Sequence, residues 1–119
     1  MALIVVTTLL SSIATTTLAD APVIEAVQVD RFGSGWTVSV SLSHPDTGWD
    51  HYADGWEVLD ADGNSLGIRV LAHPHVNEQP FTRSLGSVEI PAGAEFISIR
   101  ARDNVAGWFE ELFRVDLEN

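Results

Sequence analysis

The spacing most suggestive of chemistry in this sequence of 119 residues is a histidine pair, His73 and His75, with one residue between them. Side chains two positions apart on an extended backbone project to the same side, so both imidazoles could reach one metal ion. Histidine and carboxylate ligands suit Zn²⁺ or Cu²⁺. Pro74 constrains the backbone between them, which leaves the alternative that the pair only ties down a long loop. The candidate metal ligands are His73 and His75, with a third ligand from His44, His51, Asp46 or Glu78.

The same part of the chain also contains the side chains that protein interfaces favour. Aromatic residues and arginine supply most of the anchoring contacts in such interfaces. The alternative for an aromatic such as Phe81 is burial beneath its own long loop. The candidate recognition residues are Trp49, Tyr52, His73, His75, Arg83 and Asp103, and their partner would be an unknown protein or small ligand.

A third hypothesis is a small hydrolytic enzyme, because histidines and carboxylates can form acid–base pairs. The sequence contains no G-x-S-x-G nucleophile motif, no P-loop and no dinucleotide fingerprint. It contains no cysteine, so a disulfide, a thiol nucleophile and a thiolate metal site are all excluded. A domain of this size also leaves little room for a deep substrate pocket. We therefore predict that the protein is not an enzyme and that no cofactor other than zinc or copper is involved.

The charge of the chain is strongly one-sided. It has 17 acidic residues against 6 arginines and no lysine, for a formal net charge of −11. Nucleic-acid binding needs a basic surface to neutralise phosphates, and an anionic membrane surface attracts basic segments. We therefore predict no binding to nucleic acid. Such acidity favours solubility, with a cationic partner as the alternative.

The first residues carry no charge until Asp20, and the stretch "ALIVVTTLL" is typical of the apolar region of a secretory signal. "TLA" at 17–19 provides the small residues that a signal peptidase reads, although no basic residue precedes the apolar run. A membrane-spanning helix needs about 20 mostly apolar residues, and this segment is shorter and rich in threonine and serine. We predict a signal peptide over 1–19, a domain over 20–119, an exported (periplasmic or secreted) protein, and no membrane insertion of the mature form.

The mature part reads as short strands separated by turns. The run from Trp36 to Ser43 alternates apolar and polar residues, which is the pattern of a strand with one buried face. Asp62-Gly63 has the positive-φ preference of a tight hairpin, and the flanking residues do not fit a calcium loop. Ile68 and Val70 are expected to face inward. Strands are expected at 22–30, 36–43, 51–60, 66–71, 85–91, 96–103 and 108–118, with Trp36, Val38, Trp56, Ile97, Ile99, Phe113 and Val115 buried.

Two stretches carry a resemblance to a known fold family. "IRARDNVAG" (99–107), followed by a final alternating strand, and "WTVSVSLSHPDTG" (36–48) resemble parts of bacterial immunoglobulin-like and fibronectin-III-like domains. The sequence departs from that pattern in having no cysteine pair and no tyrosine in the sixth strand. The resemblance implies an all-β fold, a single antiparallel immunoglobulin-like β-sandwich of about seven strands. It carries no functional residue over to this chain.

In an antiparallel sandwich the connections alternate between two ends. The second, fourth and sixth connections should therefore share one end, and all four histidines lie in or beside them, together with Asp46, Asp50, Glu78 and Asp103. Long loops on a rigid scaffold are where function usually resides. We therefore predict a non-enzymatic binding module that recognises its partner through this end. The alternative is a periplasmic zinc- or copper-binding protein that uses His73 and His75 with a third histidine or carboxylate.

Overall fold

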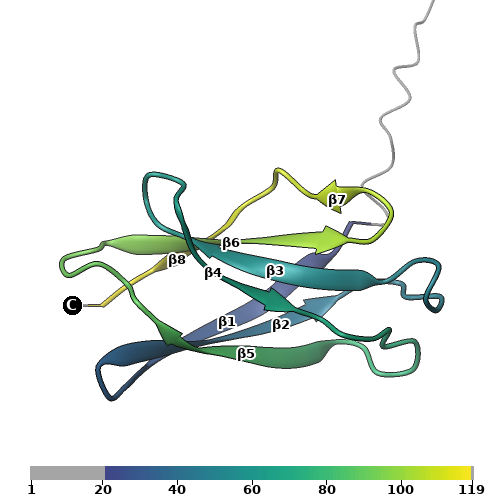
Figure 1. Cartoon of the computed structure of the whole chain (residues 1–119), viewed down its shortest axis with the longest axis horizontal. Helices are drawn as coiled ribbons and strands as arrows, with labels where there is room; N and C mark the ends of the chain where they lie inside the picture. The colour runs from purple at the N-terminus through teal and green to yellow at the C-terminus, as the bar shows by residue number, and fades with distance from the viewer. Residues whose placement is uncertain (1–20, 119) are drawn as a thin grey trace, which may run out of the picture.

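The computed structural model describes residues 21–118, so the predicted signal peptide lies outside the described residues. The described part is all-β, which confirms the predicted fold class (Figure 1). Within it, no helix has the length and apolar character that crossing a membrane requires. The strands are β1 (Val23–Phe32), β2 (Gly35–Ser43), β3 (Ala53–Leu59), β4 (Ser65–Val70), β5 (Phe81–Val88), β6 (Phe96–Asp103), β7 (Gly107–Trp108) and β8 (Phe113–Asp116).

The strands form two antiparallel sheets packed face to face. One sheet has the order β1-β2-β5, and the other has the order β4-β3-β6-β7, with β8 also pairing to β6. The β2–β3, β4–β5 and β6–β7 connections lie together at the right of Figure 1, where strands of both sheets terminate. We call this the loop end. The β1–β2, β3–β4 and β5–β6 connections lie at the opposite end, which we call the turn end.

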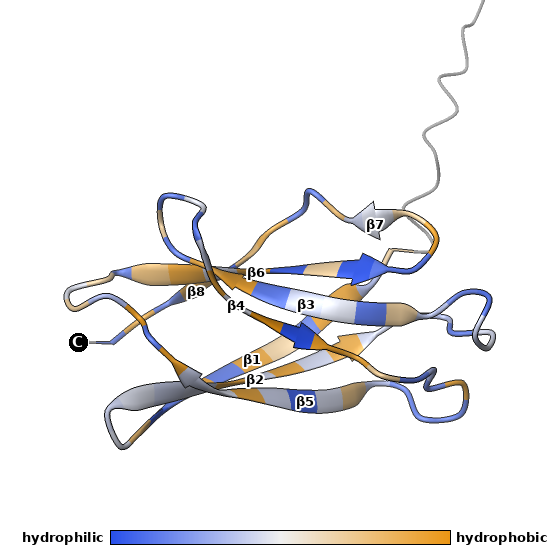
Figure 2. Ribbon diagram, in the orientation of Figure 1, coloured by the Kyte–Doolittle hydropathy of each residue, from blue (hydrophilic) through white to orange (hydrophobic). Residues whose placement is uncertain are grey.

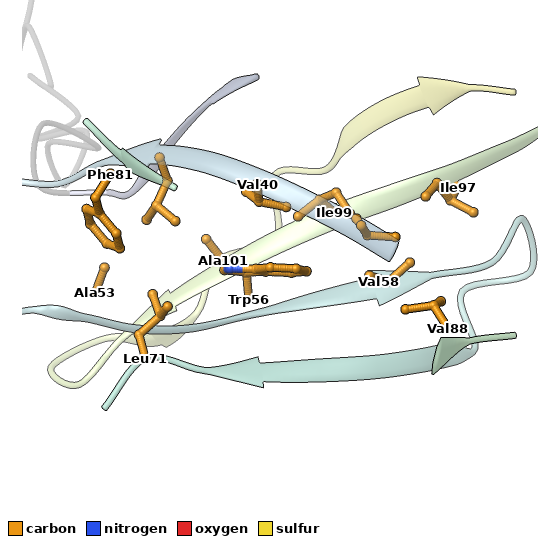
Figure 3. Close-up of a cluster of buried hydrophobic side chains, with 12 residues drawn as sticks. Val40, Ala53, Trp56, Val58, Leu71, Phe81, Val88, Ile97, Ile99 and Ala101 are labelled. Atoms are coloured by element: carbon orange, nitrogen blue, oxygen red, sulfur yellow. The ribbon is translucent and has the colours of Figure 1, made fainter. Parts of the chain in front are cut away.

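The core fills the space between the two sheets, with Trp56 at its centre (Figure 3). The predicted burial is confirmed for Val38, Trp56, Ile97 and Ile99, while Trp36 and Val115 are half-buried. A buried tryptophan removes roughly 150–250 Å² from water, so Trp56 is a principal contributor to the stability of the fold. Phe81 is also buried, and it lies on the side of the core nearest the loop end.

The predicted inward orientation of Ile68 and Val70 is wrong. The register between β3 and β4 shifts beside Gly67, because Val58 pairs with Gly67 whereas Leu59 pairs with Ser65. A bulge of this kind inserts one residue and reverses the alternation that follows it. Ile68 and Val70 therefore face solvent.

The predicted strand over 108–118, with a bulge or a strand start expected at Glu111, is interrupted at that point, and the predicted burial of Phe113 is wrong. The chain leaves the sheet between β7 and β8, and Phe113 is 37% exposed. Glu111 falls on the inward phase of that predicted strand, and burying an unpaired carboxylate is costly. An excursion from the sheet avoids this cost. The fifth strand likewise begins at Phe81 rather than at Leu85, which shortens the preceding loop.

Candidate functional site

The loop end is built by three connections that are bonded directly to one another. Ala53 at the start of β3 pairs with Asp103 at the end of β6, which brings the β2–β3 and β6–β7 connections together. The Asn104 side chain bridges them, because its Nδ2 donates to the carbonyl of Trp49 (2.9 Å) and its Oδ1 accepts from the amide of Tyr52 (2.9 Å). Figure 2 shows β6 turning from apolar to hydrophilic towards this end. Polar side chains therefore converge where the two sheets end.

Three of these side chains form a compact cluster, which we call the triad: His44, His51 and Asp103. Nε2 of His44 lies 3.3 Å from Oδ2 of Asp103, and Nε2 of His51 lies 3.0 Å from the same oxygen. One ligand atom from each residue falls within 4.8 Å of the other two. The side chains of His44 and Asp103 are buried, whereas that of His51 is 24% exposed. The triad is therefore reached from solvent on the His51 side.

Asp46 contacts the ring nitrogen of His44 that does not face Asp103. Its Oδ1 lies 2.5 Å from Nδ1 of His44, and the carboxylate also accepts the amides of Ala53 (2.9 Å) and His75 (2.8 Å). A carboxylate on one ring nitrogen of a histidine sets the tautomer and directs the other nitrogen at a metal. Asp46 is therefore in the position of a supporting group, not of a direct ligand.

Asp103 is oriented in a similar way by the backbone that follows it. Its Oδ1 accepts the amides of Val105 (3.0 Å) and Ala106 (2.6 Å), which leaves Oδ2 facing the two histidines. Burial by itself raises the pKa of Asp103. The hydrogen bonds from the Ala106 amide, the His51 ring and the Val105 amide outweigh burial and hold the pKa below its ordinary value. Asp103 is therefore a carboxylate at neutral pH.

The three contacts of this cluster need more protons than two neutral histidines carry. The contacts Asp46–His44, His44–Asp103 and His51–Asp103 each need one proton, and the two carboxylates supply none. Hydrogen bonding alone therefore requires a doubly protonated, cationic His44. A divalent cation between the two Nε2 atoms and Oδ2 of Asp103 would satisfy the same atoms with both histidines neutral, and it would offset both buried carboxylate charges.

Two of the three separations in the triad are close to those around a metal ion. Zn²⁺ binds histidine nitrogen and carboxylate oxygen at about 2.0–2.2 Å, so neighbouring ligands of a tetrahedral ion lie about 3.3–3.5 Å apart. The two Nε2–Oδ2 separations of 3.0 and 3.3 Å are near this value and are also hydrogen-bond lengths. The three ligand atoms lie within 4.8 Å of one another, so the two imidazoles would move closer together around an ion. The same contacts also tie the loops of the two sheets together, so the cluster has a structural role with or without an ion.

The histidine pair of the β4–β5 loop lies outside the triad. The ring of His75 stacks on Phe81 with centroids 3.8 Å apart, and its Nε2 accepts a hydrogen bond from Arg83 (2.9 Å). Burial lowers the pKa of His75, and the nearby charges of Arg83 and His73 lower it further. Among residues 21–118, the group of three close ligand atoms is the triad, and it includes neither His73, His75 nor Glu78.

The predicted recognition residues divide by exposure. Trp49 is 66% exposed and packs edge-on against Tyr52, with ring centroids 5.6 Å apart. His73 is also exposed, whereas His75 and Asp103 lie beneath the surface. Arg83 is half-buried against the His75 ring.

Sequence reasoning placed Asp103 only among the recognition residues and did not name Val76 or Val105. These two valines are the other exposed large apolar residues of the loop end. Val105 is two positions after Asp103, so the signal for it was its place in the same short connection.

Comparison with known proteins gives one relative of unassigned role. No family model matches the sequence, and no solved structure matches it. The chain is 36% identical over 102 residues to a protein of Halomicrobium mukohataei named putative lipoprotein. The aligned part covers 86% of this chain and 50% of that protein, so the chain spans about half the length of this relative.

Proposed function

We propose that this protein is a binding module that takes up one divalent transition-metal ion, Zn²⁺ or Cu²⁺, at its loop end. The observation that carries the proposal is the convergence of two imidazole nitrogens and one ionised carboxylate oxygen within 4.8 Å. Imidazole and carboxylate are ligands that suit these two ions. His44, His51 and Asp103 are the ligands, and Asp46 holds His44 in the required tautomer.

The proposal is binding and not catalysis. A catalytic metal needs a substrate cavity beside it. A groove of about 540 Å³ runs along β1 and the β7–β8 excursion, and a second of about 430 Å³ lies at the turn end. Neither is lined by a residue of the triad. The acidic surface further favours a cation over nucleic acid as the ligand.

The proposal also includes export and an immunoglobulin-like or fibronectin-III-like type of sandwich. The name of the Halomicrobium mukohataei relative, putative lipoprotein, supports export. The topology supports this type, because β1, β2 and β5 share one sheet while β3, β6 and β8 share the other, as strands A, B, E and C, F, G do in immunoglobulin sandwiches.

Calorimetric titration of the metal-free, tag-free protein with Zn²⁺ and Cu²⁺ tests the proposal. We expect one ion per chain, with binding that weakens below about pH 6 because the ligand histidines must be deprotonated. His51→Ala and Asp103→Asn should each weaken binding at least tenfold. The matched control is His73→Ala, which removes an exposed imidazole of the same loop end and should change nothing. Absence of binding to the parent protein, or equal loss in the control, would overturn the proposal.

A further inference from the structure

We infer that the metal bound by the triad keeps one coordination position open, and that this position accepts an exposed histidine of a partner protein that carries an apolar side chain beside it. The inference rests on the proposed metal binding and adds the chemistry of the partner. It joins two features of the loop end, the buried triad and the exposed apolar residues on the loops that carry it.

The open position follows from the number of ligands. Residues 21–118 supply three ligand atoms to the site, whereas Zn²⁺ in proteins takes four. The side chains of His44 and Asp103 are at most 2% exposed, and that of His51 is 24% exposed. A fourth ligand therefore approaches past His51.

Two large apolar side chains lie on the loops that carry the exposed ligand and its neighbour. Trp49 is two residues before His51, and Val105 is two residues after Asp103, and each is 66% exposed. Exposed apolar residues occur elsewhere on this domain too, Phe32 among them, but tryptophan is an anchor typical of recognition sites.

These side chains are held in place without being buried. The loop of Trp49 is closed by a bridge between Gly48 and His51, and Asn104 binds the carbonyl of Trp49 and the amide of Tyr52. The Trp49 ring also packs against Tyr52. Because the loop is already ordered, a partner loses less conformational entropy on binding there. The hydrogen bonds therefore favour a preformed binding surface.

The charge of the site selects a neutral donor. The carboxylates of Asp46 and Asp103 already offset a divalent ion, and the chain as a whole carries −11. Asp50 is exposed on the β2–β3 loop, and Glu78 is exposed on the β4–β5 loop. An anionic fourth ligand would meet this negative field, whereas a neutral imidazole would not. An imidazole with an apolar neighbour therefore matches both the ion and the rim formed by Trp49 and Val105.

The test uses the protein loaded with Co²⁺, whose visible absorption reports the ligands of the ion. Three dipeptides blocked at both ends serve as probes: histidyl-phenylalanine, histidyl-glycine and aspartyl-phenylalanine. We expect a saturable spectral change with both histidine peptides. Histidyl-phenylalanine should bind about tenfold more tightly, since its ring would bury apolar surface against Trp49 and Val105. Aspartyl-phenylalanine should bind most weakly.

Two variants test whether the exposed apolar residues contribute to peptide affinity independently of the ion. At full cobalt occupancy, Trp49→Ala should bring the affinity for histidyl-phenylalanine down to that for histidyl-glycine. Phe32→Ala removes an exposed aromatic ring at the turn end, so it should leave all three affinities unchanged.

Failure of the proposed metal site and failure of this inference give different results. If Co²⁺ does not bind, the proposed metal site falls together with this inference. If Co²⁺ binds but no histidine peptide changes the spectrum, or if Trp49→Ala leaves the tenfold difference intact, only this inference is overturned. Cobalt-dependent dimerisation that is lost in His73→Ala would give the open position to a second copy of this chain, and would overturn its assignment to a different protein.

Discussion

The two ends of this sandwich close the same sheets by different means. At the turn end the bonds are local: Oδ1 of Asp60 accepts the amides of Asp62 and Asn64, at most four residues away. At the loop end, local bonds are joined by bonds between segments distant in sequence, since His44 meets Asp103 across 59 positions and Asp46 meets His75 across 29. The turn end therefore holds itself together segment by segment, whereas the loop end exists only once both sheets have formed.

The two ends also differ in how their polar groups are solvated. Local turns need no buried charge, because water solvates their polar groups. The loop end buries two carboxylates and two histidines, which is costly unless they are paired or bind a cation. The proposed metal site would account for the buried carboxylates and histidines of the loop end.

Removing one carboxylate from each end should show the largest difference. Asp46→Ala leaves three buried donors without an acceptor, and we expect it to lower the free energy of unfolding by about 3–5 kcal/mol. Asp60→Ala also removes an acceptor of two amides, but these lie at the surface, so the loss should be about 1 kcal/mol. Urea unfolding followed by tryptophan fluorescence measures both. Equal losses would contradict the proposed asymmetry between the ends.

Metal removal should give the next largest effect, and it should act through the loop end alone. An ion that binds only the folded state stabilises it by about 2.7 kcal/mol at one hundred times the dissociation constant. Thermal unfolding with Zn²⁺ and then with excess chelator should show a higher Tm in the metal-bound parent protein. The shift should vanish in His51→Ala and persist in Asp60→Ala. A shift that survives in His51→Ala would place the ion elsewhere.

Acidification should weaken the loop end before it affects the turn end, and His75 supplies the first step. Its folded-state pKa lies below the ordinary 6.5 because burial, Arg83 and His73 disfavour the charged ring. The unfolded chain therefore takes up this proton first, so stability is lost as the pH falls below about 6.5.

The measurement is the pH dependence of the unfolding free energy in chelator. His75→Gln removes the titration, so the decline between about pH 6.5 and 5 should be shallower than in the parent protein. Asp103 acts later in the same direction, since its lowered pKa places its loss of stability below about pH 4. An unchanged slope in His75→Gln would remove His75 as a cause.

The sequence predicted those parts of the fold that depend on local alternation. The run from Trp36 to Ser43 predicted a strand with one buried face, and β2 has its apolar residues buried as that pattern requires. It did not predict the outward turn of Ile68 and Val70, because the bulge arises from the register between β3 and β4. Bulges and register depend on partners distant in the chain, and no local pattern records them.

The candidate site also has a part that the sequence predicts and a part that depends on contacts between distant segments. Alternating connections were enough to expect all four histidines at one end. Which of them converge depends on the pairing of Ala53 with Asp103 and on the hold of Asp46 on His44, and both are contacts between separate segments. The H-x-H spacing predicted that His73 and His75 are metal ligands. In the structure the His75 ring stacks on Phe81 and its Nε2 accepts a hydrogen bond from Arg83.

The smallest effect is expected from the exposed apolar residues of the two ends. Trp49 and Phe32 are both large, exposed and remote from the core, so Trp49→Ala and Phe32→Ala should each change the unfolding free energy by no more than about 0.5 kcal/mol. Urea unfolding of the metal-free protein measures this directly. A loss above 1 kcal/mol in Trp49→Ala alone would mean that its edge-on contact with Tyr52 stabilises the fold. In that case Trp49 would have a structural role in the loop end and would not form part of a binding surface. Near-neutral stability together with altered ligand binding is the combination that only a recognition role produces.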